Sequence, residues 1–188
     1  MMGVRLCGFD SDEERVEYLN SYWSDEWDIY EIVDIITSIQ DDRIKAEQLE
    51  IFRVYMDDRA TADIIKSIQD DEIKIELMSK YIMDEFEYLI AKVIASIQDD
   101  GKKVEQLKKY EDKVGEHNIG SIIASIQDDR IKAKQLEIYK ESINEYQISD
   151  TIKSIQNDEK KLEQLAKYED RIQDFSGIIA SIQDDEKK

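Results

Sequence analysis

A five-residue segment, Ser-Ile-Gln-Asp-Asp, recurs through the chain and constrains its fold more than any other feature. With one Asn variant, it begins at Ser38, Ser67, Ser96, Ser125, Ser154 and Ser181. Successive serines are 29 residues apart, except for a last step of 27. A period of 29 accommodates one helical hairpin, with two helices of about 11–13 residues and two short turns. The repeat therefore predicts an array of helical hairpins.

Apolar residues keep fixed positions around each serine and define the two helices of a hairpin. In the first copy, the residues before and just after the serine are Ile32, Ile36 and Ile39. Those after the acidic pair are Ala46, Leu49, Phe52 and Met56. Steps of three and four residues place each set on one face of an α-helix. The phase changes between the sets, so we expect the first helix to end and the second to begin at the acidic pair.

The first acid of each pair is predicted to cap the second helix. These predicted caps are Asp41, Asp70, Asp99, Asp128 and Asn157. Asn and Asp are nearly equivalent N-caps, because either side-chain oxygen accepts a backbone N–H. The second acid lies at the first helical position, where its negative charge would interact favourably with the positive end of the helix dipole. The alternative is calcium binding, but no loop of about 12 residues with alternating oxygen ligands follows the pair, so we expect no metal site.

The serine and glutamine of the segment permit two interpretations. A small serine would let neighbouring helices approach, and a partly buried glutamine amide would tie the turn to the next repeat. Alternatively, a row of these side chains would contact a ligand.

The fold class that follows is all-α: an α-solenoid of about five helical hairpins with an N-terminal capping helix and a C-terminal half-repeat. The expected divisions are 1–27, an acidic and aromatic cap; 28–173, five repeats; and 174–188, the half-repeat. The capping helix should run from about Asp12 to Tyr22, after a capping box at Ser11 and Glu14. Surface loops are expected at the tetrapeptides DDRA, FEYL, GEHN and NEYQ, which precede the first helices.

Composition limits the classes of partner. The net charge of −19 disfavours nucleic acid and anionic membranes and favours basic proteins. Hydrophobic residues make up 41% of the chain, too many for a disordered acidic tail. Cys7 is the only cysteine, no signal-peptide core is evident, and no apolar run reaches the roughly 18 residues of a membrane span. We therefore expect a soluble, cytoplasmic protein.

The pattern IIxSIQDDxIKxxQL, from about Trp27 to Lys188, resembles tetratricopeptide-like helical repeats. In those repeats an aliphatic-Ser-Ile run ends the first helix, and an Asp starts a second helix that carries a Leu. The period here is 29 residues rather than 34, and the Trp, Gly and Pro signature positions of the family are absent. The resemblance implies helical hairpins and a protein-binding groove, and it implies no chemistry.

Nothing in the sequence predicts catalysis or a cofactor. His117 is the sole histidine, and we expect it to be solvated in the GEHN loop. The chain carries no Ser–His–Asp arrangement, glycine-rich phosphate loop or HExxH motif.

Two surfaces are candidates for binding a partner. One is the solvent side of the first helices, where residues vary among copies; its candidates are Asp34, Asp63, Lys66, Lys92, Asp150 and Lys153. The alternative there is an ordinary solvated face with local ion pairs. The other is the N-terminal aromatic segment, with candidates Trp23, Trp27 and Tyr30. Its alternative is a seal at the end of the stack.

The functional hypothesis is a non-enzymatic scaffold that binds a peptide or protein, basic partners included. The competing hypotheses are an acidic mimic of nucleic acid, which would block a DNA- or RNA-binding protein, and a structural spacer without a ligand.

Overall fold

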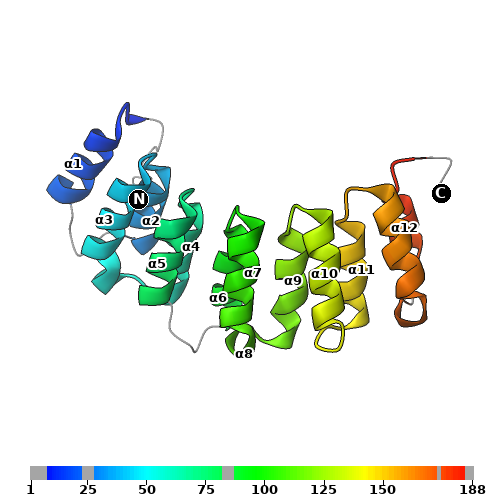
Figure 1. The fold of residues 1–188 in the computed structure, drawn as a ribbon. Helices are drawn as coiled ribbons and strands as arrows, with labels where there is room; N and C mark the ends of the chain where they lie inside the picture. Colours follow the sequence, from blue (N-terminus) through cyan, green and yellow to red (C-terminus); the bar gives the residue numbers. More distant parts are fainter. Residues whose placement is uncertain (1–7, 23–27, 82–86, 173–174, 185–188) are drawn as a thin grey trace. The chain divides into compact units, whose positions relative to one another are not determined.

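A computed structural model describes residues 8–22, 28–81, 87–172 and 175–184. These residues form helices and turns and contain no strand, which confirms the all-α helical-repeat fold. The chain divides into two compact units, Met1–Leu89 and Ile90–Lys188 (Figure 1). Each unit is described by itself below.

The first unit contains a single helix followed by two hairpins. The single helix is α1 (Asp12–Tyr22), which packs on α2. The hairpins are α2 (Ile29–Ser38) with α3 (Asp42–Phe52), and α4 (Asp58–Ser67) with α5 (Asp71–Tyr81). A 3₁₀ turn, η2 (Arg53–Tyr55), follows α3. The first helices of the two hairpins, α2 and α4, pack on each other. The second helices, α3 and α5, do the same, as stacked repeats require.

The second unit continues the pattern. Its hairpins are α6 (Glu87–Ser96, which begins just before the unit boundary) with α7 (Asp100–Lys109), α9 (Glu116–Ser125) with α10 (Asp129–Tyr139), and α11 (Glu145–Lys153) with α12 (Asp158–Lys167). The short α8 (Glu111–Val114), η3 (Glu169–Arg171) and α13 (Ser176–Ala180) complete it. Here α9 packs on α11, and α11 packs on α13.

The predicted apolar positions form the core of each unit. Ile32, Ile36 and Ile39 of the first copy are buried, and so are Leu49 and Phe52 of its second helix. The position three residues before each serine is also buried, and this position was not predicted. Its occupants are Ile35, Ile64, Val93, Ile122, Thr151 and Ile178. Some predicted positions depart from this. The position eight residues after the serine is only half-buried in every copy (Ala46, Ile75, Val104, Ala133 and Leu162), and Ile179 near the C-terminus is exposed.

Of the tetrapeptides expected to be loops, DDRA, GEHN and NEYQ instead provide the N-caps and first turns of first helices. In FEYL, the described residues 87–89 are the start of α6. Asp57 and Asn144 cap α4 and α11, and the residues after them are helical. His117, expected in a loop, is an exposed residue in the first turn of α9. That helix begins after Gly115, whose φ of 72° lies in the left-handed region that favours glycine.

Candidate functional site

The first acid of each pair accepts hydrogen bonds from the start of its own second helix, as an N-cap does. Asp41 Oδ1 accepts from the backbone N–H of Arg43 at 2.8 Å and of Ile44 at 3.2 Å. The same role is taken by Asp70, Asp99, Asp128 and Asn157. At Asp128 these two backbone hydrogen bonds lower the pKa of the carboxyl.

The second acid connects one repeat to the next, a role that the sequence did not reveal. Asp42 begins α3, as predicted, but its Oδ2 accepts from the backbone N–H of Gln69 at 2.8 Å and of Asp70 at 2.7 Å. In the second unit, Asp100, Asp129 and Asp158 make the equivalent contacts. Each carboxylate therefore holds the interhelical turn of the following hairpin.

A buried lysine accompanies each of these acids. Lys45, three residues after Asp42, donates from Nζ to the carbonyl oxygen of Ser67 at 3.1 Å. Three equivalent lysines do the same to Ser125, Ser154 and Ser181, namely Lys103, Lys132 and Lys161. These four lysines are at most 4% exposed. Burial lowers the pKa of Lys45 and Lys132, although the nearby carboxylates of Asp42 and Asp129 act in the opposite direction.

The serine and glutamine side chains donate hydrogen bonds to backbone carbonyls close to their own turn. Ser38 Oγ donates to the carbonyl of Ile35 at 2.7 Å, and Gln40 Nε2 donates to the carbonyl of Ser38 at 2.9 Å. Gln40 is exposed, so the expectation of a partly buried amide that ties the turn to the next repeat is wrong there. The tie comes from the aspartate and lysine of the preceding second helix. We call this set of contacts, from one second helix to the next Ser-x-Gln-Asp turn, a joint.

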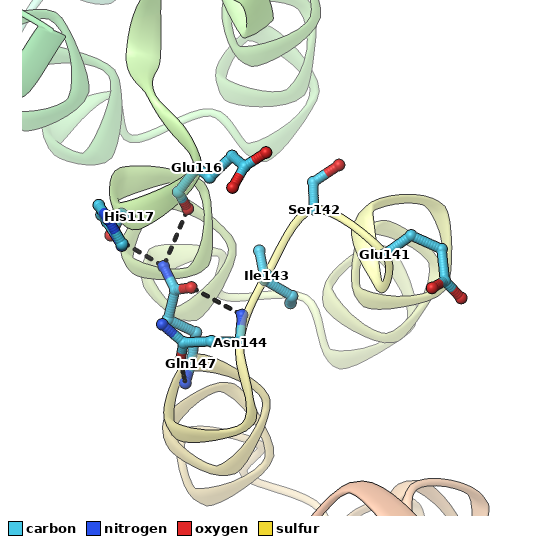
Figure 2. A pocket seen from close by; sticks show the side chains of 7 residues that line it. All are labelled: Glu116, His117, Glu141, Ser142, Ile143, Asn144 and Gln147. Atoms are coloured by element: carbon cyan, nitrogen blue, oxygen red, sulfur yellow. Dashed lines mark hydrogen bonds between the residues drawn. The ribbon is translucent and has the colours of Figure 1, made fainter.

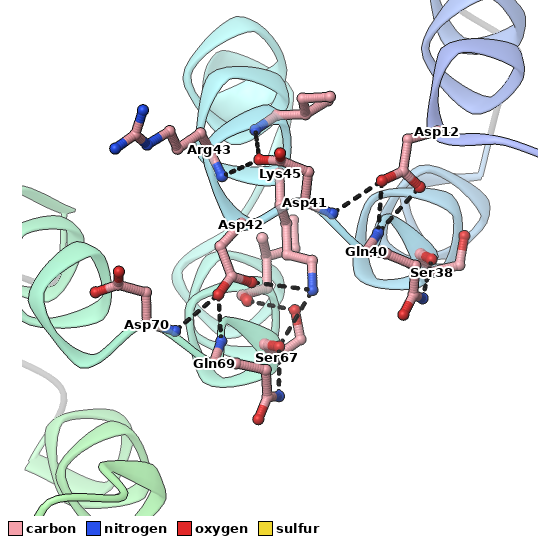
Figure 3. A network of polar contacts seen from close by, with 12 residues as sticks. Asp12, Ser38, Gln40, Asp41, Asp42, Arg43, Lys45, Ser67, Gln69 and Asp70 are labelled. Atoms are coloured by element: carbon pink, nitrogen blue, oxygen red, sulfur yellow. Dashed lines mark hydrogen bonds and ion pairs between the residues drawn. The ribbon is translucent and has the colours of Figure 1, made fainter.

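Helix α1 makes a joint of the same kind, as Figure 3 shows. Asp12 accepts from the backbone N–H of Gln40 at 3.0 Å and of Asp41 at 2.8 Å, and Arg15 Nε donates to Ser38 Oγ at 3.1 Å. Burial raises the pKa of Asp12, but these backbone bonds and Arg15 outweigh it and lower the pKa. Thus α1 occupies the place of a second helix in the first joint.

The predicted capping box before α1 is half formed. Ser11 Oγ accepts from the backbone N–H of Glu14 at 3.2 Å. The Glu14 carboxylate, however, accepts from the N–H of Asp10 at 2.8 Å, one residue before the cap.

The candidate partner-binding residues lie on the outer faces of first helices. In the first unit, Tyr30 and Asp34 are on α2, and Asp63 and Lys66 are on α4, which packs against α2. The Asp63 and Lys66 side chains approach to 3.9 Å.

In the second unit, Lys92 is a half-buried residue of α6, and Asp150 and Lys153 of α11 form an ion pair at 3.2 Å. These local pairs were anticipated, and each is worth only a few tenths of a kcal/mol. Trp23 and Trp27 lie outside the described residues.

Five exposed residues share one position of the repeat, and of these only Tyr30 was among the predicted binding residues. Eight residues before the joint serines stand Tyr30, Arg59, Tyr88, His117 and Tyr146, all exposed. Tyr30 is 61% and Tyr146 is 72% exposed. The recurrence of tyrosine at this position, in three of the five repeats, is the sequence signal that indicates these residues.

A shallow pocket of about 230 Å³ opens in the second unit beside this set (Figure 2). It is lined by Glu116, His117, Glu141, Ser142, Ile143, Asn144 and Gln147. Gln147 Nε2 donates to the carbonyls of Glu116 at 3.1 Å and His117 at 2.8 Å, and Gln147 also completes a capping box with Asn144. These bonds fix α11 against α9, so the polar lining is largely structural.

Among the described residues, no three His, Cys, Asp or Glu side chains come together in a way that could hold a metal ion. In the same part of the chain, no helix combines the length and apolar character needed to cross a membrane.

Comparison with known proteins finds no match to this chain among family models, curated proteins or solved structures.

Proposed function

We propose that this chain is a non-enzymatic scaffold that binds a peptide or protein through the solvent-exposed face of its first helices. The observation that carries the proposal is the exposed tyrosines on helices that the joints hold in place. Tyr30 and Tyr146, four repeats apart in sequence, occupy the same position and expose most of their surface.

Exposed tyrosines are well suited to recognition. A tyrosine provides a large amphipathic surface and loses little conformational entropy on binding, because it has only two side-chain torsions. When a rigid helix carries the tyrosine, the loss of conformational entropy on binding is smaller still. The α2 helix that carries Tyr30 is fixed by its N-cap Asp28 and by the joint at Ser38 and Gln40.

Residue variation among the repeats also supports the exposed face of the first helices as the binding surface. The joint residues are nearly invariant, because each has a hydrogen-bonding role in the stack. By contrast, the position four residues before the serine is occupied by Asp34, Asp63, Lys92, Ser121 and Asp150. The fold therefore leaves the composition of this face open to whatever a partner requires.

The distribution of acids favours a scaffold over a mimic of nucleic acid. One acid of each joint caps a helix and the other holds the next turn, so these carboxylates are not arranged as a free, phosphate-like row. On the first-helix face, Asp63 and Asp150 are paired with lysines.

We also propose that the protein acts in the cytoplasm and that it uses no cofactor.

The test is affinity capture with the full chain, followed by identification of the captured proteins by mass spectrometry. The matched variants are Tyr30→Ser with Tyr146→Ser, on the binding face, and Lys134→Ser, an exposed residue on the second helix α10. We expect a partner that the tyrosine double variant loses and the Lys134 variant retains. A partner retained equally by both would contradict binding at this face.

Salt dependence separates the scaffold from the mimic. Binding through tyrosines and a few charges should weaken only modestly from 50 to 200 mM salt. A mimic that reproduces several phosphate contacts should lose about three or more decades of affinity over that range.

A further inference from the structure

Three large apolar side chains at the end of α3 are exposed. Ile51 is 54%, Val54 80% and Tyr55 52% exposed. They follow one another at i, i+3 and i+4, so they lie on one side of the helix end and the 3₁₀ turn η2. We call these three residues the α3 patch. Contiguous exposed apolar residues, unlike scattered ones, mark interaction sites.

A later repeat shows that apolar residues are not required at the positions of Val54 and Tyr55. In the hairpin of α9 and α10, three repeats later, the equivalent residues are Ile138, Glu141 and Ser142. Glu141 and Ser142 there line the polar pocket of Figure 2. The same backbone segment thus tolerates charged and polar side chains, so packing does not explain Val54 and Tyr55.

The surroundings of the α3 patch are acidic. Glu47 and Glu50 lie one helical turn before Ile51 and Val54, and Asp57 follows two residues after Tyr55; all three are exposed. Two nearby cations have acidic partners: Arg53 pairs with Asp58 at 2.8 Å, and Lys80 pairs with Glu50. An apolar centre with an acidic rim results.

We propose that the α3 patch is a second docking surface, distinct from the first-helix face, and that its occupant is a basic amphipathic segment of a partner protein. Leucine-like side chains of the segment would cover Ile51, Val54 and Tyr55, and its lysines or arginines would face Glu47 and Asp57. A second copy of this chain is disfavoured as the occupant, because the patches of two copies would bring two acidic rims together on chains of net charge −19.

The test uses the full ¹⁵N-labelled chain and a synthetic 16-residue peptide of leucine and lysine, with leucines at i, i+3 and i+4 spacing. Control peptides replace every lysine with glutamate, or every leucine with serine. Val54→Glu with Tyr55→Ser installs the residues of the later repeat, and Ile138→Ser is the matched control on the second unit. We expect amide shift changes concentrated at residues 47–58 and affinity at least about tenfold weaker in the double variant, but unchanged in Ile138→Ser. Neither control peptide should match the leucine–lysine peptide.

Three results would overturn the proposal. One is shift changes spread over all acidic faces, with equal binding by the leucine-free peptide. Another is shift changes confined to the first-helix face, which would leave the proposed function intact. The third is concentration-dependent self-association, measured by sedimentation, that the double variant abolishes. Because the mapping on the unmodified chain stands alone, the test remains decisive even if the double variant is unstable.

Discussion

Replacement of the buried Lys132 by methionine should weaken the joint between the fourth and fifth hairpins. Lys132 Nζ donates to the carbonyl of Ser154 at 2.7 Å and to its Oγ at 2.9 Å, and the side chain is 2% exposed. Hydrogen bonds from a charged donor contribute roughly 1.5–3 kcal/mol. Two features reduce the loss: Gln156 also donates to the Ser154 carbonyl, at 3.2 Å, and methionine relieves the burial of a charge.

We therefore expect Lys132→Met to lower the free energy of unfolding by about 1–2 kcal/mol. Lys132→Ala also removes three buried methylene groups, each worth roughly 0.8 kcal/mol, so it should cost about 3.5–4.5 kcal/mol in total. The difference between the two variants separates the packing contribution from the polar one.

The measurement is urea unfolding followed by circular dichroism, with amide hydrogen exchange to locate the change. Since stacked repeats are coupled mainly to their neighbours, exchange should accelerate most in α11 and α12, and the transition should broaden. The control is Lys134→Met on the same helix, exposed and expected to change stability by no more than about 0.5 kcal/mol. The reasoning is refuted if Lys132→Met is as stable as the Lys134 control, or if methionine and alanine cost the same.

Further predictions concern four individual positions. Asn157→Asp should leave stability nearly unchanged, whereas Asn157→Ala should cost about 1 kcal/mol in urea unfolding; equal effects would argue against capping. Gly120→Ala should destabilise the second unit by about 1–3 kcal/mol, because its Cβ would lie 2.6 Å from Gln147 Cβ. Gly177→Ala, which meets only the movable end of a lysine, should be close to neutral in the same assay. Glu137 is held by hydrogen bonds from a lysine first and then a second lysine and a tyrosine, which lower its pKa from 4.5 to about 2. Its contribution to stability is therefore present above pH 4.5 and lost as pH falls through 2, and Glu137→Gln should flatten the acid unfolding profile between these values.

The sequence was sufficient to predict the helices, their order and most of the core. The 29-residue period fixed the hairpins, and the steps of three and four residues located Ile32, Ile36 and Leu49 in the interior. These predictions succeeded because they depend on local periodicity. Helix starts were less accurate: the tetrapeptides taken as loops contain polar N-caps, and the caps at Asp57 and Asn144 were overlooked.

The joint was not predicted beyond its helix caps, for a physical reason. Lysine recurs at the position of Lys45 in every full repeat, but constancy alone does not distinguish a buried lysine from a solvated one. The acceptor, the Ser67 carbonyl, belongs to the next repeat and is a backbone atom without any sequence signature. Likewise, the exposure of Val54 and Tyr55 depends on the 3₁₀ turn η2 that follows α3, and the apolar pattern does not specify this turn.

Because each joint aspartate contacts backbone N–H groups, and each joint lysine contacts a backbone carbonyl, the contacts scarcely depend on which copy follows. A 29-residue block excised or duplicated in register by unequal recombination would meet the same backbone acceptors and donors at both new boundaries. Changes in the number of hairpins should therefore be tolerated far better than insertions of other lengths between the helices of one hairpin. The number and order of the repeats, and with them the exposed residues, can therefore change while the contacts between neighbouring repeats stay the same.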